Sequence, residues 1–438
     1  MDPMNVVIIM TDQQSARSLP MYGNPVVQTP NLASFASRGA LFENAFTSCP
    51  LCVPARVSMF TGQYPSAHGS LDNNILMSPG RDHLLKALKD AGYATGLAGK
   101  NHCFRRDDLK LFDSMAECGH YGPSTGDPKY AEPKRYLQQC GALKACWGST
   151  VNPFPPDRLG TTWTTDRAIE FVEAKQDMPF FLWYSIADPH IPFQTCEPYA
   201  SMYPPDRVDL SPLKEGEMDS KPRAQQIDRH VMQGDLVDED TIRRIRSIYY
   251  GINTYIDTEI GRFLERLDEL GLSDDTLVIY VADHGEYLGE HRMIRKSKAA
   301  YDCLTQIPFM VRGPGVRPSA CREFVSLEDV MPTVLGMLGI DIPCGVQGRD
   351  LTPLLRGESF AGRGFAYGEY GAHPLPFAGD AYAVCESPHS PDFKPSNKVG
   401  GYGKMRYLRT DEWKLVAYVQ DTYELYNVRE DPFELENV

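Results

Sequence analysis

Residues able to bind a cation, hold an anion or move a proton follow four short apolar runs of the sequence. They are Asp12 and Gln13 after residues 5–10 (NVVIIM), Lys100 and His102 after 94–99 (ATGLAG), His190 after 180–185 (FFLWYS), and Asp283 and His284 after 277–282 (LVIYVA). Carboxylate and amide oxygens suit hard divalent cations, and lysine ammonium groups suit anionic oxygens. Histidine can give or take a proton near neutral pH. The pattern predicts a single site at which these groups meet.

The elements that would position these residues are buried strands of an α/β fold. Short apolar runs alternate with helical stretches, which is typical of a large, mostly parallel sheet sandwiched by helices. Open sheets of this kind bind ligands in the crevice outside the carboxyl ends of their strands. We expect helices over 241–271 and over 326–339, the second with Ser326 as its N-cap.

The rest of the chain predicts loops and a second, smaller unit. Segments 104–165 and 194–236 are rich in Pro, Gly and charge, and long loops of this type are often lids or binding loops. From about residue 359 the pattern changes to short strands with turns. We therefore expect a catalytic α/β domain over 1–358 and a small C-terminal α+β subdomain, with an antiparallel sheet, over 359–438.

Composition narrows the class of protein and of partner. The 438 residues are 42% hydrophobic and 23% charged, as in an ordinary globular chain, and the formal net charge is −14. That charge argues against nucleic acid as a partner, and no apolar run is long enough to suggest a membrane span. The start of the sequence lacks a basic segment followed by an apolar one, which favours a cytoplasmic location unless a leader has been removed. The sequence carries no signal of oligomeric state.

Two short motifs compete for Cys52. Cys49 and Cys52 have the C-x-x-C spacing of a redox dithiol or of half a zinc site, whereas Cys52 to Arg56 reads C-x-P-x-R. A redox role requires a small thioredoxin-like pattern, and a zinc role requires a second pair of ligands. The sequence shows neither, and the eleven cysteines are otherwise scattered. We therefore expect Cys49 to be a small buried hydrophobic residue and most cysteines to be free thiols.

The second motif resembles the signature of the type I sulfatases of the alkaline phosphatase superfamily. The match begins with NVVIIMTDQQ and CVPARVSMFTGQYPSAHG (52–69) and continues through GYATGLAGKNH (92–102), DPHIPF (188–193), VADHGEYLGEH (281–291) and IPFMVRGPG (307–315). In that family the Cys of C-x-P-x-R is oxidised by a maturase to formylglycine, an aldehyde that hydrates to a gem-diol. The resemblance implies an α/β sulfatase fold and hydrolysis of a sulfate monoester, carried by a small molecule or a saccharide.

The resemblance also implies a role for each candidate residue. The metal ligands would be Asp12, Gln13, Asp283, His284 and the modified Cys52, with Ca²⁺ favoured and Mg²⁺ or Mn²⁺ possible alternatives. Gln13 stands where the commonest family pattern has a second Asp, which removes one negative charge. The modified Cys52 would supply the attacking oxygen, oriented by Arg56.

The remaining roles concern the ester oxygens and the protons. Lys100 and Lys296 would hold sulfate oxygens, His190 would protonate the leaving oxygen, and His102 would act as the base that helps to expel sulfate and regenerate the aldehyde. Lys298 is an alternative to Lys296. Asn73 is either an active-site amide or a residue of a plain turn.

Three alternatives stay open at this point. Phosphonate monoester hydrolases and phosphodiesterases of the same superfamily also resemble the chain, including the Asp-Gln pair, although they generally replace Lys100 and His102. A catalytically inactive member would keep Cys52 as a thiol and act as a binding module. A redox protein using Cys49 and Cys52 has the least support. Among sulfate esters, sugar, aryl and small alkyl sulfates all fit the sequence.

Overall fold

The computed structural model describes residues 4–140, 147–297, 299–371, 404–419 and 421–438. Among these residues the main element is a sheet of nine strands in the order β12-β2-β11-β10-β1-β8-β4-β5-β6. The strands are β12 (Ser319–Cys321), β2 (Ala40–Phe42), β11 (Phe309–Arg312), β10 (Thr276–Ala282), β1 (Asn5–Asp12), β8 (Phe180–Pro189), β4 (Ala94–Gly99), β5 (Ser114–Gly119) and β6 (Gly122–Pro123). The fold expected from the sequence, a large mixed sheet with helices, is confirmed.

The centre of the sheet is parallel. β1 lies between β10 and β8, β4 lies on the far side of β8, and all of these neighbours pair in parallel. Their carboxyl ends therefore meet at one edge of the sheet. β11 and β6 are the strands that run antiparallel to their neighbours β10 and β5. The four apolar runs of the sequence thus form the four central strands of the sheet.

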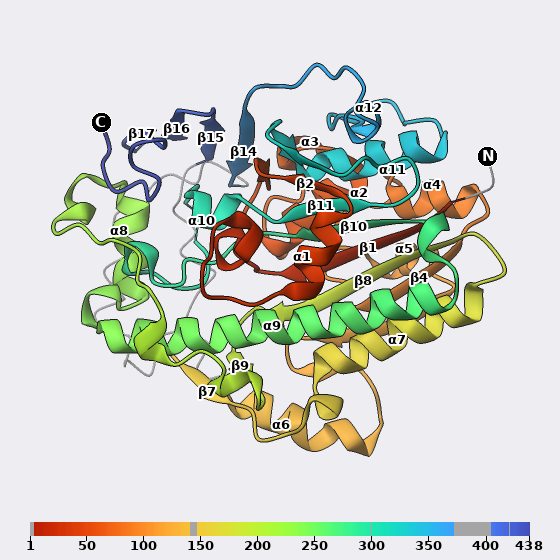
Figure 1. Cartoon of the computed structure of the whole chain (residues 1–438). Coiled ribbons are helices and arrows are strands. Elements are labelled where there is room, and N and C mark those ends of the chain that lie inside the picture. Colours follow the sequence, from red (N-terminus) through yellow and green to blue (C-terminus); the bar gives the residue numbers. More distant parts are fainter. Residues whose placement is uncertain (1–3, 141–146, 298, 372–403, 420) are drawn as a thin grey trace.

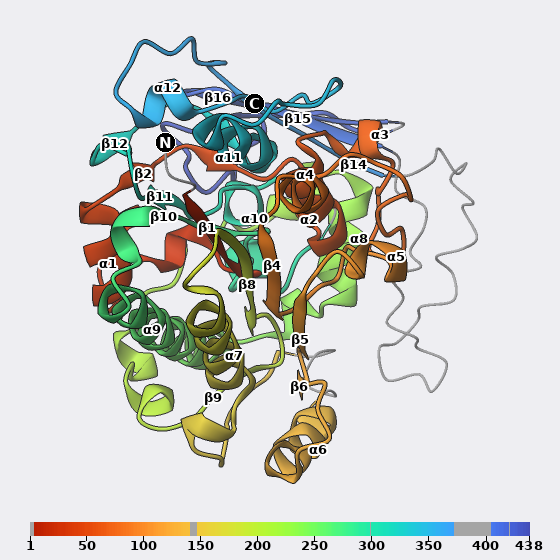
Figure 2. The ribbon, with the colours of Figure 1, turned by 90° about the vertical axis from the view of Figure 1, so that its right-hand side faces the viewer.

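Helices cover both faces of the main sheet. Alternate residues of β1 therefore belong to different hydrophobic cores. Val7 and Ile9 pack with α1 (Pro30–Ser37), α7 (Gly160–Lys175) and α9 (Glu239–Glu269). Val6 and Ile8 pack with α2 (Cys52–Thr61), α4 (Leu84–Asp90) and α11 (Val330–Leu338). Figure 2 shows the sheet between these two helical layers. Such two-sided burial explains the continuous apolar runs.

The helices expected from the sequence are present. α9 corresponds to the predicted 241–271 but lies two residues earlier at each end, with the Asp238 side chain accepting from the Thr241 amide at its start and Gly271 at φ 70° after its end. Ser326 begins the second predicted helix with a capping box that includes Asp329. The shorter helices are α3 (Pro65–His68), α5 (Arg106–Leu109), α6 (Ala131–Gln139), α8 (Arg223–Val231), α10 (Asp302–Thr305) and α12 (Thr352–Leu355).

Segment 104–165 differs from the loop that we expected. It contains the edge strands β5 and β6 of the main sheet, as well as α5 and α6. Three of the five non-glycine residues of β5 (Ser, Ala and Glu) are poor or neutral strand formers, so the sequence pattern is weak and pairing with β4 decides the conformation. In 194–236 the structure has the short strand β9 (Phe193–Thr195), which pairs with β7 (Ser149–Val151), and helix α8.

A smaller sheet follows near the C-terminus, lying beside the upper helical layer in Figure 1. Among the described residues it has four antiparallel strands: β14 (Ala366–Tyr370), β15 (Met405–Arg409), β16 (Trp413–Tyr418) and β17 (Glu424–Asn427). Its buried face packs on Phe46, Ala300 and Phe324 of the larger unit. The domain boundary at 358/359 stays a prediction. A two-strand pair, β3 (Ala45–Phe46) with β13 (Val325–Ser326), lies near this contact.

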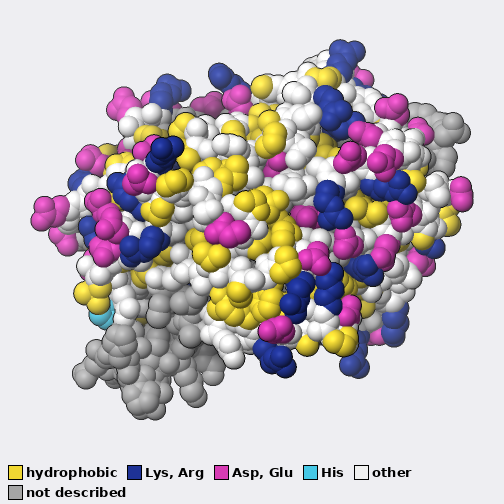
Figure 3. Space-filling view, turned by 60° about the horizontal axis from the view of Figure 1, so that its bottom comes forward, with side chains coloured by type: hydrophobic (Ala, Val, Ile, Leu, Met, Phe, Trp, Pro, Cys, Tyr) yellow, Lys and Arg dark blue, Asp and Glu magenta, His cyan; other side chains and the backbone are white. Residues whose placement is uncertain are grey.

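The surface carries mixed charge. On the face seen in Figure 3, Lys and Arg side chains lie among Asp and Glu side chains and do not gather in one basic stripe. Within the described ranges, every helix is too short or too polar to cross a lipid bilayer.

Candidate functional site

The carboxyl edge of the central sheet carries the predicted residues. Asp12 ends β1, Asp283 follows β10, His190 follows β8, and Lys100 follows β4. Gly99, at φ 110°, makes the turn into Lys100, and a Cβ at this position would lie 1.8 Å from the Ser185 carbonyl oxygen. Only glycine can therefore bring β4 close enough to β8 at this point.

Helix α2 delivers Cys52, its first residue, to the same edge. Its N-cap Leu51 offers no side-chain hydrogen bond, but the Asn73 side chain accepts from the backbone amide of Val53 at 3.0 Å. Asn73 thus satisfies one of the unpaired amides at the helix start. The positive end of the helix dipole also favours negative charge at Cys52. Every residue of α2 is buried, so the position of Cys52 is fixed by packing.

Arg56, one helical turn after Cys52, connects the two carboxylates of the site. It is fully buried and donates to Asp12 Oδ2 at 2.9 Å and to Asp283 Oδ2 at 3.0 Å. It also donates to the Lys100 carbonyl oxygen at 3.0 Å and to Ser185 Oγ at 2.8 Å. The guanidinium uses Oδ2 of both carboxylates, so Arg56 leaves both Oδ1 atoms to other contacts.

A possible metal site forms around those two oxygens. Asp12, Cys52, Asp283 and His284 each offer one ligand atom, and these atoms lie within 4.8 Å of one another. Cys52 Sγ is 3.2 Å from His284 Nε2 and 3.6 Å from Asp12 Oδ1. His284 Nδ1 donates to the Gly285 carbonyl oxygen at 2.9 Å, which leaves the Nε2 lone pair for a ligand. All four side chains are buried, so a cation here would be shielded from bulk water.

Gln13 joins the metal side of the site to its anion side. Its Oε1 accepts from Lys296 Nζ at 2.5 Å, and its Nε2 donates to Glu286 Oε2. Its backbone amide donates to Asp283 Oδ1 at 2.9 Å. Glu286 therefore orients the amide, and a carboxylate at position 13 would face the Glu286 carboxylate. This contact gives a physical reason for Gln in place of the commoner Asp.

The ammonium groups of two lysines lie beside this group. Lys100 Nζ donates to Asp12 Oδ2 and is 3.0 Å from His120 Nε2, whereas Lys296 Nζ is 3.0 Å from His190 Nε2. The ammonium groups thus stand beside the metal ligands, where they could hold the oxygens of an anion.

The charges of the site shift the pKa of its acids. Burial raises the pKa of the Asp12 carboxyl, but Lys100, His190 and Arg56 outweigh it and hold the pKa well below the usual range. For Asp283, burial and the nearby Asp12 carboxylate raise the pKa. The Asp12 carboxyl therefore ionises first, and its negative charge disfavours a second negative charge on Asp283.

The thiol of Cys52 is shifted in the direction of a thiolate. Burial and the Asp12 carboxylate raise its pKa, but Lys100, Lys296 and His284 together hold that pKa well below its usual range. In Cys49 the pKa is raised well above the usual range by burial, and its side chain belongs to the core under the C-terminal sheet. The two cysteines of the C-x-x-C spacing therefore differ in character. All nine described cysteines are free thiols.

His102 makes no hydrogen bond to the group in the part of the chain that the structure describes. His102 adopts a left-handed backbone (φ 57°), and its buried Nδ1 has no hydrogen-bond partner among the described residues. An unpaired buried nitrogen next to Lys100 is available to a ligand, but no hydrogen bond to Cys52 is present. Lys298 lies outside the described residues.

Sequence reasoning missed three residues that contact the group. Glu286 follows His284 closely in DHGE, so its place in the motif was a usable signal. Ser185 ends the apolar run of β8 and reads as part of that run. His120 lies twenty positions beyond Lys100 in a turn between two weak strands, and the sequence gives no signal for it.

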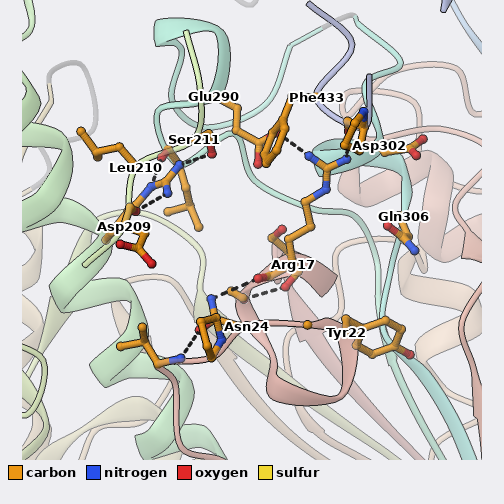
Figure 4. A pocket seen from close by; sticks show the side chains of 18 of the residues that line it. Arg17, Tyr22, Asn24, Asp209, Leu210, Ser211, Glu290, Asp302, Gln306 and Phe433 are labelled. Carbon is orange, nitrogen blue, oxygen red and sulfur yellow. Dashed lines mark hydrogen bonds and ion pairs between the residues drawn. The ribbon is translucent and has the colours of Figure 1, made fainter. Parts of the chain in front are cut away.

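A separate cavity of about 450 Å³ lies beside Arg17 (Figure 4). Arg17 donates to Glu290 Oε2 at 2.7 Å and to the Pro432 carbonyl oxygen at 2.6 Å, and its guanidinium lies over the Phe433 ring. The described lining contains none of the candidate site residues. The contacts join the segment after Asp283 to the C-terminal segment of the chain.

Comparison with known proteins agrees with this geometry. The family model described as Sulfatase matches residues 4–340. An arylsulfatase of Clostridium perfringens is 28% identical over 84% of this chain and 81% of its own length. The multifunctional alkaline phosphatase superfamily protein PehA of Trinickia caryophylli is 29% identical over 80% of this chain and 77% of its own length. A phosphonate monoester hydrolase of Agrobacterium radiobacter shares the fold, with a TM-score of 0.79, 23% identity, and coverage of 99% of this chain and 91% of that one.

Proposed function

The chain belongs to the sulfatase family, and from that premise we propose that it hydrolyses a sulfate monoester, R–O–SO₃⁻ + H₂O → R–OH + HSO₄⁻. The observation that carries the proposal is the buried group of Asp12, Cys52, Asp283 and His284 within 4.8 Å, with a lysine ammonium beside it. This arrangement supplies a nucleophile position, a cation site and an anion site at one sheet edge.

We propose a divalent cation, with Ca²⁺ first and Mg²⁺ or Mn²⁺ as alternatives. Asp12, Asp283, Gln13 and His284 would hold it, together with the oxygen that replaces the sulfur of Cys52. Carboxylate and amide oxygens fit these hard cations, and the ligand atoms of Asp12, Cys52, Asp283 and His284 lie within 4.8 Å of one another. When bound, the cation would stabilise negative charge on the attacking oxygen and on the ester.

We also propose that Cys52 is the residue that a maturase converts to formylglycine. Its place at the first residue of a helix, beside His284 and Asp12, supports a nucleophile there rather than a structural thiol. The hydrated aldehyde would supply the oxygen that attacks sulfur. Arg56 would hold the residues around the modified Cys52 in place, because four acceptors fix its guanidinium.

The remaining residues bind the ester and move protons. Lys100 and Lys296 would each turn a free N–H toward a sulfuryl oxygen. His190 Nε2 accepts from Lys296, so one mobile proton already lies between these two groups. That pair would give a proton to the leaving oxygen as the S–O bond to R breaks. His102 would take the proton whose removal releases sulfate.

A substrate panel tests the proposal. Protein produced together with a maturase is assayed side by side on an aryl sulfate, a sulfated monosaccharide, an alkyl sulfate, a phosphonate monoester and a phosphodiester. We expect the highest kcat/KM on one of the sulfate esters. A sulfate rate far below the phosphorus-ester rates would instead support the second candidate, a phosphonate monoester hydrolase or phosphodiesterase, which Gln13 favours. No turnover of any ester by protein carrying the aldehyde would support a binding module.

A further inference from the structure

Each lysine of the site donates to one metal-side acceptor and to one imidazole. Lys100 Nζ donates to Asp12 Oδ2 and lies 3.0 Å from His120 Nε2. Lys296 Nζ donates to Gln13 Oε1 and lies 3.0 Å from His190 Nε2. An ammonium group has only donors, so each Nε2 must accept and each imidazole is neutral in this arrangement.

The two imidazoles of these pairs are stacked. The ring centroids of His120 and His190 are 3.7 Å apart and the ring planes differ by 20°. The His190 Nδ1 donates to the Ile191 carbonyl oxygen at 2.8 Å, which fixes the edge of the ring opposite Lys296. The His120 ring covers one face, so hydrogen bonds and stacking together restrict the rotation of His190.

A hairpin at the edge of the main sheet brings His120 to this place. His120 and Tyr121 form the two-residue turn between Gly119 and Gly122, which pair across β5 and β6. β5 pairs with β4, and the register places Glu117 beside Gly99, the residue before Lys100. The same strand neighbours therefore hold Lys100 and His120 at a fixed separation.

We propose that His120 is a positioning residue of the sulfate-ester site: its Nε2 orients the Lys100 ammonium toward the sulfuryl group, and its ring fixes the plane of His190. The inference rests on the proposed function. A lysine on a flexible stem has several rotamers, and a second acceptor beside Asp12 selects one of them. In that rotamer a remaining N–H of Lys100 would point toward the sulfuryl group of the ester. The stack keeps His190 Nε2 beside Lys296, where the leaving oxygen needs a proton.

Two substitutions separate these two contributions. His120→Phe keeps an aromatic ring for the stack but removes the acceptor for Lys100. His120→Gln keeps an acceptor but removes the ring. Met115→Leu, at an exposed position of β5 in the same hairpin, is the matched control. Each protein is assayed on an aryl sulfate with an activated leaving group, 4-nitrophenyl sulfate, and on phenyl sulfate, whose leaving group needs protonation more.

The expected kinetic effects differ between the two variants. For His120→Phe we expect KM to rise about tenfold on both substrates with kcat changed much less, because a hydrogen bond that orients a charged group is lost. For His120→Gln we expect KM close to wild type and kcat on phenyl sulfate reduced about threefold to tenfold, which is the scale of a lost ring contact. The 4-nitrophenyl sulfate rate should fall less. Met115→Leu should match the wild type.

Binding of inorganic sulfate provides a readout that needs no turnover. By calorimetry on the metal-loaded protein, His120→Phe should weaken sulfate binding about tenfold, whereas His120→Gln should stay within about twofold of wild type. Equal losses in both variants, accompanied by an equal fall in the thermal midpoint, would show a merely structural role and overturn the inference. A His120→Phe variant that matches the wild type in sulfate binding would also overturn it. If the wild type prefers phosphorus esters, the proposed function fails, but the sulfate-binding comparison still decides the role of His120.

Discussion

At the scale of single residues, the site is organised by side chains that hold other side chains. Arg56 donates to Oδ2 of Asp12 and of Asp283 and leaves both Oδ1 atoms to other partners, of which the Gln13 backbone amide is one. Glu286 likewise holds the Gln13 side chain: it accepts the amide N–H and so directs Oε1 toward Lys296. Gln13 therefore has, in Glu286, an acceptor for its amide N–H, which an Asp at this position could not use.

Substitution of Glu286 tests this match. Glu286 also accepts from the Leu288 and Arg295 amides, and burial raises its pKa to about 7. We expect Glu286→Gln to lower kcat/KM by about tenfold to a hundredfold, because the Gln13 amide loses the acceptor that orients it. The metal concentration for half-maximal activity should rise as well. The control is Glu290→Gln, whose partner Arg17 lies away from the site; equal effects of the two changes would contradict the argument.

At the scale of elements, strand ends and one helix start determine where the chemistry can occur. The apolar runs of β1, β4, β8 and β10 could be predicted because burial on both faces requires continuous apolar sequence. The positions of Asp12, Lys100 and Asp283 followed from those runs. The β5–β6 hairpin could not be predicted, since its pairing with β4 is long-range and its sequence has weak strand propensity. His120 was missed for this reason.

The start of α2 offers a test of helix positioning. Asn73 accepts from the Val53 amide, next to Cys52. We expect Asn73→Ala to lower the free energy of unfolding by about 1 kcal/mol, as for a lost cap, and to lower kcat more than it raises KM. Asn74→Ala is the control, because Asn74 is exposed and contacts Asp72. Urea denaturation and steady-state kinetics measure both effects. Equal behaviour of the two alanine variants would show that Asn73 has no special role.

The capping segment before α11 predicts a pH dependence of stability. Glu328 is fully buried, and burial raises its pKa from 4.5 to about 7. The native state therefore holds a proton between these values that the unfolded state releases, so this residue makes stability fall as pH rises from about 4.5 to 7. The free energy of unfolding is measured by urea titration at pH 5 and at pH 8. We expect Glu328→Gln to make the decrease between these two pH values smaller by up to about 3 kcal/mol. The exposed Glu358→Gln should leave the slope unchanged, and an unchanged slope in Glu328→Gln would contradict the assignment.

At the scale of the whole molecule, buried ion pairs connect the C-terminal sheet to the rest of the structure. Lys414 of β16 is fully buried and donates to Asp302 Oδ1 and to Glu434 Oε1, each at 2.7 Å. Asp302 begins α10, in the segment that follows Lys296. Arg17 makes a second connection, from the segment after Gln13 to Pro432. The small sheet and the residues after it thus contact two segments that follow site residues in the sequence.

Substitution of Lys414 tests this connection. Lys414→Met removes the lysine that pairs with the buried Glu434 carboxylate, so we expect the free energy of unfolding to fall by about 3–5 kcal/mol. Asp302 stays paired with Arg409. Lys214→Met is the matched control, because Lys214 pairs with Glu436 on the surface and should contribute less than about 1 kcal/mol. Urea denaturation compares the two variants. A small effect of Lys414→Met would show that the sheet is held mainly by its apolar face.

The central claim of the account is that Cys52, and not Cys49, carries the nucleophile. The tryptic peptide 39–56 contains both cysteines, so Cys49 serves as an internal control. Protein produced with a maturase is alkylated, digested and analysed by peptide mass spectrometry, and the fraction converted is compared with the aryl sulfatase rate across preparations. The account predicts that –CH₂SH becomes –CHO at Cys52 alone, that Cys49 is alkylated, and that the rate rises in proportion to conversion. Full sulfatase activity in preparations whose Cys52 is entirely alkylated thiol would contradict it.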